Sequence, residues 1–168
     1  AGCRRIEAQV LHRIGEANLL AGNLVDAGSA FELALDRTRD ISDPIGEAYA
    51  LMGAGVAKVR QGEVGPARHA LQRALELAAS TGQPLTEARA LLGLGELALT
   101  TRAPEQALVF GQQASGVFRS MGALLDDARA LTLVSDAYTA LGDTEAADAS
   151  MAEAAVMTRK RLGDAELS

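Results

Sequence analysis

The stretch EARALLGLGELALTTRAPEQAL, residues 87–108, decides the fold of this chain. It has the composition of a helix, yet Ala88, Ala90, Gly93 and Gly95 stand where an isolated helix would place bulky core side chains. Small residues allow two helix backbones to approach closely. The stretch therefore predicts a helix that is packed tightly against neighbouring helices.

The same pattern recurs every forty residues without gaps. Residues 47–86 and 87–126 are identical at 12 of 40 positions. The recurring positions include Glu7, Glu47, Glu87 and Asp127; Leu11, Leu51, Leu91 and Leu131; Gly15, Gly55, Gly95 and Ser135; and Ala34, Ala74, Ala114 and Ala154. Repeats of this length cannot bury their apolar faces alone, so they stack on one another. We expect one domain over residues 1–168, with repeats at about 4–43, 44–83, 84–123 and 124–163.

Each repeat contains two helical stretches separated by turn residues. Within the repeats these are Gly22, Gly62, residues 101–104 and Gly142, and between the repeats they are residues 42–44, 81–84 and 121–123. Glycine ends helices and proline begins them. We therefore predict an all-α fold of four helical hairpins, with eight helices of about 16 to 19 residues.

Composition and charge exclude several classes of protein. An apolar content of 48% with 23% charged residues is typical of a folded globular chain. The net charge of −6 argues against direct nucleic-acid binding. Cys3 is the only cysteine, which excludes an internal disulfide, and no apolar run is long enough to span a membrane. A reducing cytoplasm is the simplest setting.

The repeated residues resemble the tetratricopeptide repeat. That family's pattern is leucine, a small residue four positions later, glycine at the turn, and two alanines on the second helix; it is matched by Leu51, Gly55, Gly62, Ala67 and Ala74. The resemblance implies a right-handed superhelix of hairpins. The forty-residue period, the absence of Trp, and Arg102, Gly111 and Ser135 depart from the pattern, so we expect less regular packing in the third and fourth repeats.

Taken together, the forty-residue copies also resemble the tetratricopeptide arms of actinobacterial transcription regulators, of the Streptomyces antibiotic regulatory protein type or the ATP-binding LuxR-like type. We interpret the chain as a fragment of a longer protein. Residues 162–167 look like the opening of a fifth repeat.

In the tetratricopeptide family the first helix of each repeat lines a concave groove. The residues that the resemblance places there, as a tentative binding site, are His12, Glu16, Tyr49, Met52, Val56, Arg89, Leu92, Glu96, Arg129 and Asp136. An apolar middle flanked by mixed charge would suit a peptide or an amphipathic helix. Two alternatives stay open: Met52, Val56 and Leu92 serve packing between helices, and the two arginines pair with Glu96, Asp126 or Asp136.

The sequence shows no catalytic constellation, and we expect neither an enzyme nor a cofactor. His12 and His69 lie in different repeats, which argues against a metal site and predicts solvated or groove-facing histidines. Each repeated carboxylate, such as Glu47, lies near a helix start, which favours a structural role. Cys3 lies near the N-terminus beside Arg4 and Arg5, and we expect no nucleophilic role for it.

Three functions remain open. The first is a scaffold that binds a protein segment, or another domain of the parent protein, as the regulatory arm of a bacterial transcription regulator. The second is a structural or oligomerising module, for example a homodimer. The third is a small-molecule sensor in the same regulator.

Overall fold

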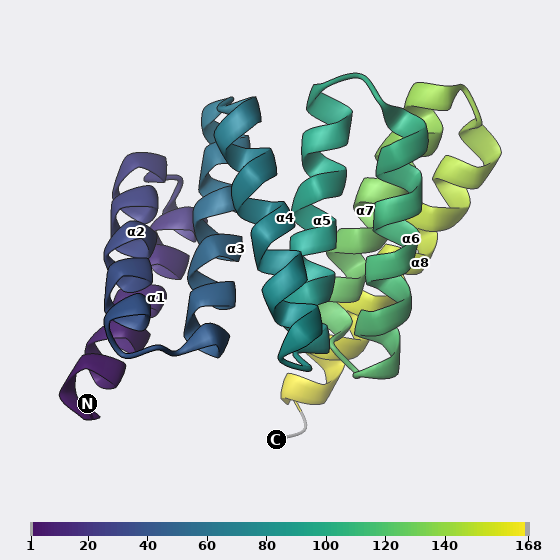
Figure 1. Ribbon diagram of the computed structural model, residues 1–168. Coiled ribbons are helices and arrows are strands. Elements are labelled where there is room, and N and C mark those ends of the chain that lie inside the picture. Colours follow the sequence, from purple (N-terminus) through teal and green to yellow (C-terminus); the bar gives the residue numbers. More distant parts are fainter. Residues whose placement is uncertain (1, 167–168) are drawn as a thin grey trace. The chain divides into compact units, whose positions relative to one another are not determined.

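The computed structural model describes the backbone of residues 2–166 and the side chains of residues 3–161 and 163. Every regular element in this part of the chain is an α-helix (Figure 1). The helices are α1 (Gly2–Ala21), α2 (Leu24–Asp40), α3 (Pro44–Gln61), α4 (Val64–Ser80), α5 (Pro84–Thr100), α6 (Pro104–Ser120), α7 (Leu124–Leu141) and α8 (Thr144–Glu166). The predicted all-α fold of four hairpins is confirmed, while the right-handed coiling of the hairpins stays a prediction.

The chain divides into two compact units, Ala1–Gly93 and Leu94–Ser168, and the boundary falls inside α5. In the first unit α1 packs against α2, α3 packs against α4, and α2 also packs against α3 of the following repeat. In the second unit α6 packs against α7, and α7 packs against α8. A second helix thus covers the first helix of the next repeat within each unit. That residues 1–168 form a single domain stays a prediction.

The turns between the helices use a left-handed residue at a fixed place in each repeat. The positive φ angles occur at Gly22 (80°), Gly62 (79°), Arg102 (58°) and Gly142 (82°) within the repeats, and at Ser42 (53°), Gly82 (65°) and Gly122 (67°) between them. The backbone N–H of Glu63 donates to the carbonyl of Lys58 at 2.9 Å, which closes the end of α3. Arg102 adopts the glycine conformation with a side chain, at a cost of about 1 kcal/mol.

Bulky side chains of the second helices fill the space that glycines leave on the first helices. A Cβ atom added to Gly15 would lie 2.7 Å from Cζ of Phe31, and the same ring also lies against Gly53. Forty residues later, Leu71 occupies the equivalent space, and its side chain would meet a Cβ of Gly55 at 2.6 Å and of Gly93 at 2.8 Å. At each of these junctions one large side chain therefore packs against a glycine on each of two successive first helices.

The junction between the third and fourth repeats reverses this arrangement. Gly111 stands at the position of Phe31 and Leu71, while Leu133 stands at the position of Gly53. Leu133 lies against Gly95, and its Cδ2 would be 3.4 Å from a Cβ added to Gly111. One bulky residue again faces two glycines, but it comes from α7 instead of the second helix. The small residues thus leave the space into which a bulky side chain of the neighbouring helix packs.

Two of the repeated carboxylates, Glu47 and Asp127, form ion pairs across the repeat junctions. Glu47 accepts a hydrogen bond from Nε of Arg39 at 3.0 Å. Asp127 is buried, with 1% of its side chain exposed; it accepts a hydrogen bond from Ser115 at 2.5 Å and one from Nε of Arg119 at 3.3 Å. These contacts favour the structural interpretation of the repeated carboxylates.

The last helix differs from the sequence-based expectation. α8 has 23 residues and continues through residue 166, so residues 162–166 do not open a fifth repeat. Residue 167 lies outside the described residues. The expected fifth repeat is therefore wrong for this segment, because the turn that ended the earlier second helices does not recur here.

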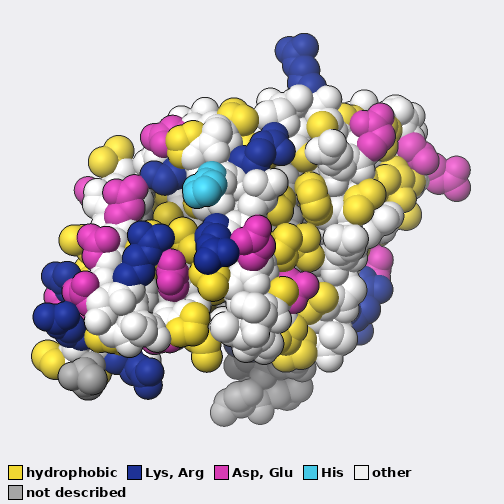
Figure 2. Space-filling model, in the orientation of Figure 1, with side chains coloured by type: hydrophobic (Ala, Val, Ile, Leu, Met, Phe, Trp, Pro, Cys, Tyr) yellow, Lys and Arg dark blue, Asp and Glu magenta, His cyan; other side chains and the backbone are white. Residues whose placement is uncertain are grey.

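The surface carries charges of both signs. Lys and Arg side chains are mixed with Asp and Glu on the face shown in Figure 2, and the sequence as a whole has a net charge of −6. None of the helices within residues 2–166 combines the length and the apolar character that crossing a membrane requires.

Candidate functional site

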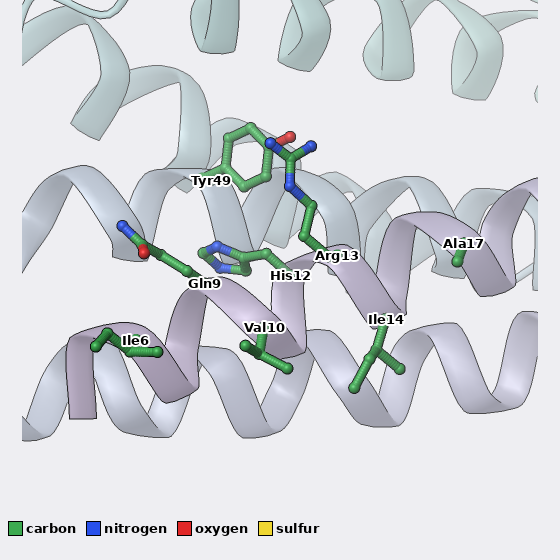
Figure 3. Close-up of a pocket in the computed structure, with 8 residues that line it drawn as sticks. All are labelled: Ile6, Gln9, Val10, His12, Arg13, Ile14, Ala17 and Tyr49. Carbon is green, nitrogen blue, oxygen red and sulfur yellow. The ribbon is translucent and has the colours of Figure 1, made fainter. Parts of the chain in front are cut away.

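An open hollow of about 810 Å³ lies along α1 in the first unit. Its lining comprises Ile6, Gln9, Val10, His12, Arg13, Ile14 and Ala17 of α1 and Tyr49 of α3. Figure 3 shows that Gln9, His12 and Arg13 point towards Tyr49, whereas Val10 and Ile14 point the opposite way. The hollow therefore combines a polar side, next to α3, with an apolar side on the outer face of α1.

The polar side is organised around Glu16. The hydroxyl of Tyr49 donates a hydrogen bond to one oxygen of the Glu16 carboxylate. The other oxygen accepts a hydrogen bond from Nη1 of Arg13 at 3.0 Å. The His12 ring lies beside this group, with its centroid 5.0 Å from that of Tyr49. The structure thus brings the predicted residues His12, Glu16 and Tyr49 together.

Burial shifts the pKa of two of these groups. Burial and the hydrogen bond to the Glu16 carboxylate raise the pKa of Tyr49 to about 12. Burial lowers the pKa of His12, although the negative charge of Glu16 opposes this. His12 is therefore neutral at pH 7, and its buried Nε2 has no hydrogen-bond partner among the described residues. Of the two expected settings for a histidine, solvated or groove-facing, His12 does not have the first, because it is only 8% exposed; it lines the hollow instead.

Three predicted apolar residues of the groove serve packing. Met52 and Leu92 are 8% and 3% exposed, so neither side chain is available at the surface. Met52 belongs to a buried cluster with Leu51, Ala74 and Ala90, against which the half-buried Val56 packs. The alternative that these residues pack between helices therefore describes Met52 and Leu92 correctly, because neighbouring helices cover the positions that the resemblance placed in the groove.

The predicted charged residues divide between the two units. Arg89 is half-buried in the first unit, and its charge opposes the rise in the pKa of Tyr49. In the second unit Arg129 lies 3.8 Å from carboxylate oxygens of both Glu96 and Asp126, while Asp136 is exposed. Pairing within the chain therefore accounts for Arg129. Such exposed pairs stabilise the fold by only about 0 to 1 kcal/mol.

The sequence analysis missed the apolar side of the hollow. Ile6, Val10 and Ile14 are 63%, 51% and 45% exposed. The signal was present in the forty-residue register, since the positions of Val10 and Ile14 carry Ala50 and Ala54 in the second repeat. Val10 and Ile14 are thus large and exposed where the second repeat has buried alanines.

The described residues contain no group of three or more His, Cys, Asp or Glu side chains placed to hold a metal ion. Cys3 is exposed and forms no disulfide. That the chain needs neither metal nor cofactor stays a prediction.

Comparison with known proteins supports the fold. Residues 128–166 match the family model described as tetratricopeptide repeat. The crystal structure of BtubC (BKLC) from P. vanneervenii is similar, with a TM-score of 0.75 over 95% of this chain and 16% sequence identity. This chain covers 66% of that structure, just under two thirds of its length. No curated protein matches the chain. The chain thus has a TPR-like fold, and tetratricopeptide repeats generally mediate protein–protein interaction and are typically non-catalytic.

Proposed function

We propose that the chain is a protein-interaction scaffold whose hollow along α1 binds a segment of another protein. The observation that carries this proposal is the row of exposed apolar side chains of Ile6, Val10 and Ile14 beside the polar group of Tyr49, Glu16 and Arg13. Clustered apolar side chains with a polar rim are typical of protein interaction sites.

The two sides of the hollow have different tasks in this proposal. The apolar side chains of α1 provide the binding free energy, because contact with a partner removes them from water. Arg13, which is 83% exposed, and Glu16 fix the orientation of the bound segment through hydrogen bonds at the rim. The polar residues Arg89, Glu96, Arg129 and Asp136 serve as further contacts, each within its own unit.

More specifically, we propose that the chain is the regulatory arm of a bacterial transcription regulator in a reducing cytoplasm. The arm would receive a protein segment, and a separate domain of the parent protein would contact nucleic acid. This role is supported by the resemblance of the forty-residue copies to such arms, together with the acidic net charge of −6.

Affinity capture with matched variants tests the proposed function. The variant pair Ile6→Asp with Val10→Asp places charge in the hollow, while Leu20→Asp with Val25→Asp changes equally exposed apolar residues elsewhere, at 90% and 73% exposure. We expect the wild type and the second pair to retain the same specific partners and the first pair to lose them. Identical partners for all three chains would refute the assignment of the hollow.

A second candidate function, small-molecule sensing, is favoured by the buried Nε2 of His12. His12 also lines a smaller hollow of about 190 Å³, together with Thr38, Asp43, Tyr49 and Gln83 among others. A small polar molecule would satisfy the unpaired nitrogen. Thermal-shift screening should then find a metabolite that stabilises the wild type saturably and has no effect on His12→Phe. Stabilisation by protein segments alone would exclude this candidate.

A further inference from the structure

His12 is a polar residue at a position that the next two repeats fill with apolar side chains. In the forty-residue register it corresponds to Met52 and Leu92, which are buried. His12 is buried to the same degree, and its Nε2 has no hydrogen-bond partner among the described residues. A buried polar atom without a partner destabilises a fold, whereas an apolar side chain there does not. Packing alone therefore does not account for a histidine at this position.

The smaller hollow, of about 190 Å³, surrounds this ring with residues of the first unit. Its lining comes from α1, α2, α3 and Gln83, which precedes α5. Figure 3 shows Gln9, His12 and Tyr49, which line this hollow as well as the larger one. Gly46 also lines it, where the third repeat has the bulkier Thr86. The space beside His12 is therefore lined by polar side chains and by a glycine.

Asp43 supplies a carboxylate to this smaller hollow. Its Oδ1 accepts a hydrogen bond from the backbone N–H of Gly46 at 3.1 Å, as the N-cap of α3. Its Oδ2 lies 3.8 Å from Nε of Arg5, which is beyond hydrogen-bond distance. The Asp43 side chain is only 17% exposed, whereas that of Arg5 is 65% exposed. Oδ2 of Asp43 is thus a shielded acceptor that can take a further hydrogen bond.

A cation that donates hydrogen bonds suits these groups best. At His12 the negative charges of Glu16 and Asp43, which raise its pKa, outweigh the positive charge of Arg13, which lowers it, so an anion is disfavoured. A neutral His12 with its proton on Nδ1 accepts a hydrogen bond at Nε2. A primary ammonium group carries three donors, enough for this nitrogen and for the carboxylate. The apolar side chain of Ile45 lines the same hollow and suits an aliphatic chain.

We propose that the smaller hollow binds a small aliphatic amine, whose protonated amino group donates hydrogen bonds to Nε2 of His12 and Oδ2 of Asp43. The inference rests on the second candidate function, small-molecule sensing, and names the class of ligand. The volume of about 190 Å³ has room for several water-sized groups, which suits a molecule such as n-butylamine. A lysine side chain of a protein segment carries the same group, so the test includes both sources.

Titration of the full chain with n-butylamine tests the proposal, followed by the imidazole signals in ¹H–¹⁵N NMR spectra. At pH 8 the amine is protonated, because amines of this type have a pKa of about 10.4. We expect saturable shifts for His12 and none for His69, which is exposed on α4. n-Butanol and butyrate, which lack the positive charge, should bind at least about tenfold more weakly. A glycine-flanked lysine peptide with blocked ends should bind no more tightly than n-butylamine.

Three chain variants test the roles of the two acceptors. Asp43→Asn keeps an N-cap for α3 and removes the charge, so it should bind n-butylamine at least about tenfold more weakly. Asp40→Asn is the matched control, because it removes a half-exposed carboxylate outside the hollow, and it should bind like the wild type. His12→Met introduces the residue of the second repeat. It should abolish binding without lowering the urea midpoint, which also checks that the variant folds.

Several results would overturn the inference. They are the lack of a saturable shift at His12, which would leave water as the partner of Nε2, and equal binding of n-butylamine by Asp43→Asn and the wild type. Tighter binding of the lysine peptide than of n-butylamine would overturn the small-amine source and assign the group to a protein segment. If thermal-shift screening finds a metabolite without an amino group that stabilises the wild type but not His12→Phe, sensing stands and only this inference fails.

Discussion

The reversed junction between α6 and α7 gives a quantitative prediction about stability. Leu133 is 4% exposed and fills the space beside Gly95 and Gly111. Leu133→Gly should cost about 4 kcal/mol, from the cavity and the loss of helix propensity. Gly111→Leu should cost about 1 to 2 kcal/mol, because its Cβ would lie 2.8 Å from Cγ2 of Val134.

The double variant Gly111→Leu with Leu133→Gly recreates the arrangement of Leu71 between Gly55 and Gly93. Independent effects would add to about 5 to 6 kcal/mol, whereas we expect a loss of less than about 2 kcal/mol, because the new leucine fills the cavity that the removed one leaves. Urea denaturation followed by circular dichroism at 222 nm measures all three variants.

Gly116→Leu is the matched control on α6, since nothing lies within 4 Å of a Cβ added there. It should be neutral or stabilise the chain by up to about 1 kcal/mol. A double variant as unstable as the sum of its singles would refute the argument that one bulky residue faces two glycines at each junction.

Four further predictions concern single residues. Arg102→Gly should raise the urea midpoint, with a gain of about 1 kcal/mol, because Arg102 has a φ of 58°. Asp127→Ala should cost about 2 kcal/mol in the same assay, since it leaves the buried hydroxyl of Ser115 without its acceptor, while Arg119 keeps Glu153 as a partner. The pH dependence of stability should reflect the shifted pKa values of Tyr49 and His12. In the variant Tyr138→Phe, the phenolate absorbance of Tyr49 should rise with pH, with a midpoint near 12. Because folding raises the pKa of Tyr49, the contribution of this residue to the stability of the fold is lost as the pH rises from about 10 to 12. The lowered pKa of His12 has the opposite effect: the contribution of this residue to stability is present above pH 6.5 and is lost as the pH falls through the folded-state pKa. Between pH 7 and 5 the urea midpoint should therefore drop less in His12→Leu than in the wild type.

Much of the fold could be predicted because its determinants are local. Gly22, Gly62 and Gly142 mark turns in the sequence, and each adopts the left-handed conformation that ends a helix. The exchange of Gly111 and Leu133 could not be predicted with the same ease. The two residues lie on different helices, and only their contact shows that one compensates for the other.

The candidate site was predicted less completely. His12, Glu16 and Tyr49 were identified from their positions in the repeat and lie together. Met52 and Leu92 were placed in the groove by the resemblance, although neighbouring helices bury them. A position rule gives the direction of a side chain but not what packs over it.

Methyl NMR of the isoleucines tests the central claim most directly, that the hollow along α1 binds a segment of another protein. The chain has four isoleucines, of which Ile6 and Ile14 lie in the hollow along α1, while Ile41 and Ile45 lie outside it. We predict that titration with the partner segment recovered by affinity capture shifts the methyl signals of Ile6 and Ile14 saturably and leaves those of Ile41 and Ile45 unchanged. Saturable binding that leaves Ile6 and Ile14 unshifted would contradict the account.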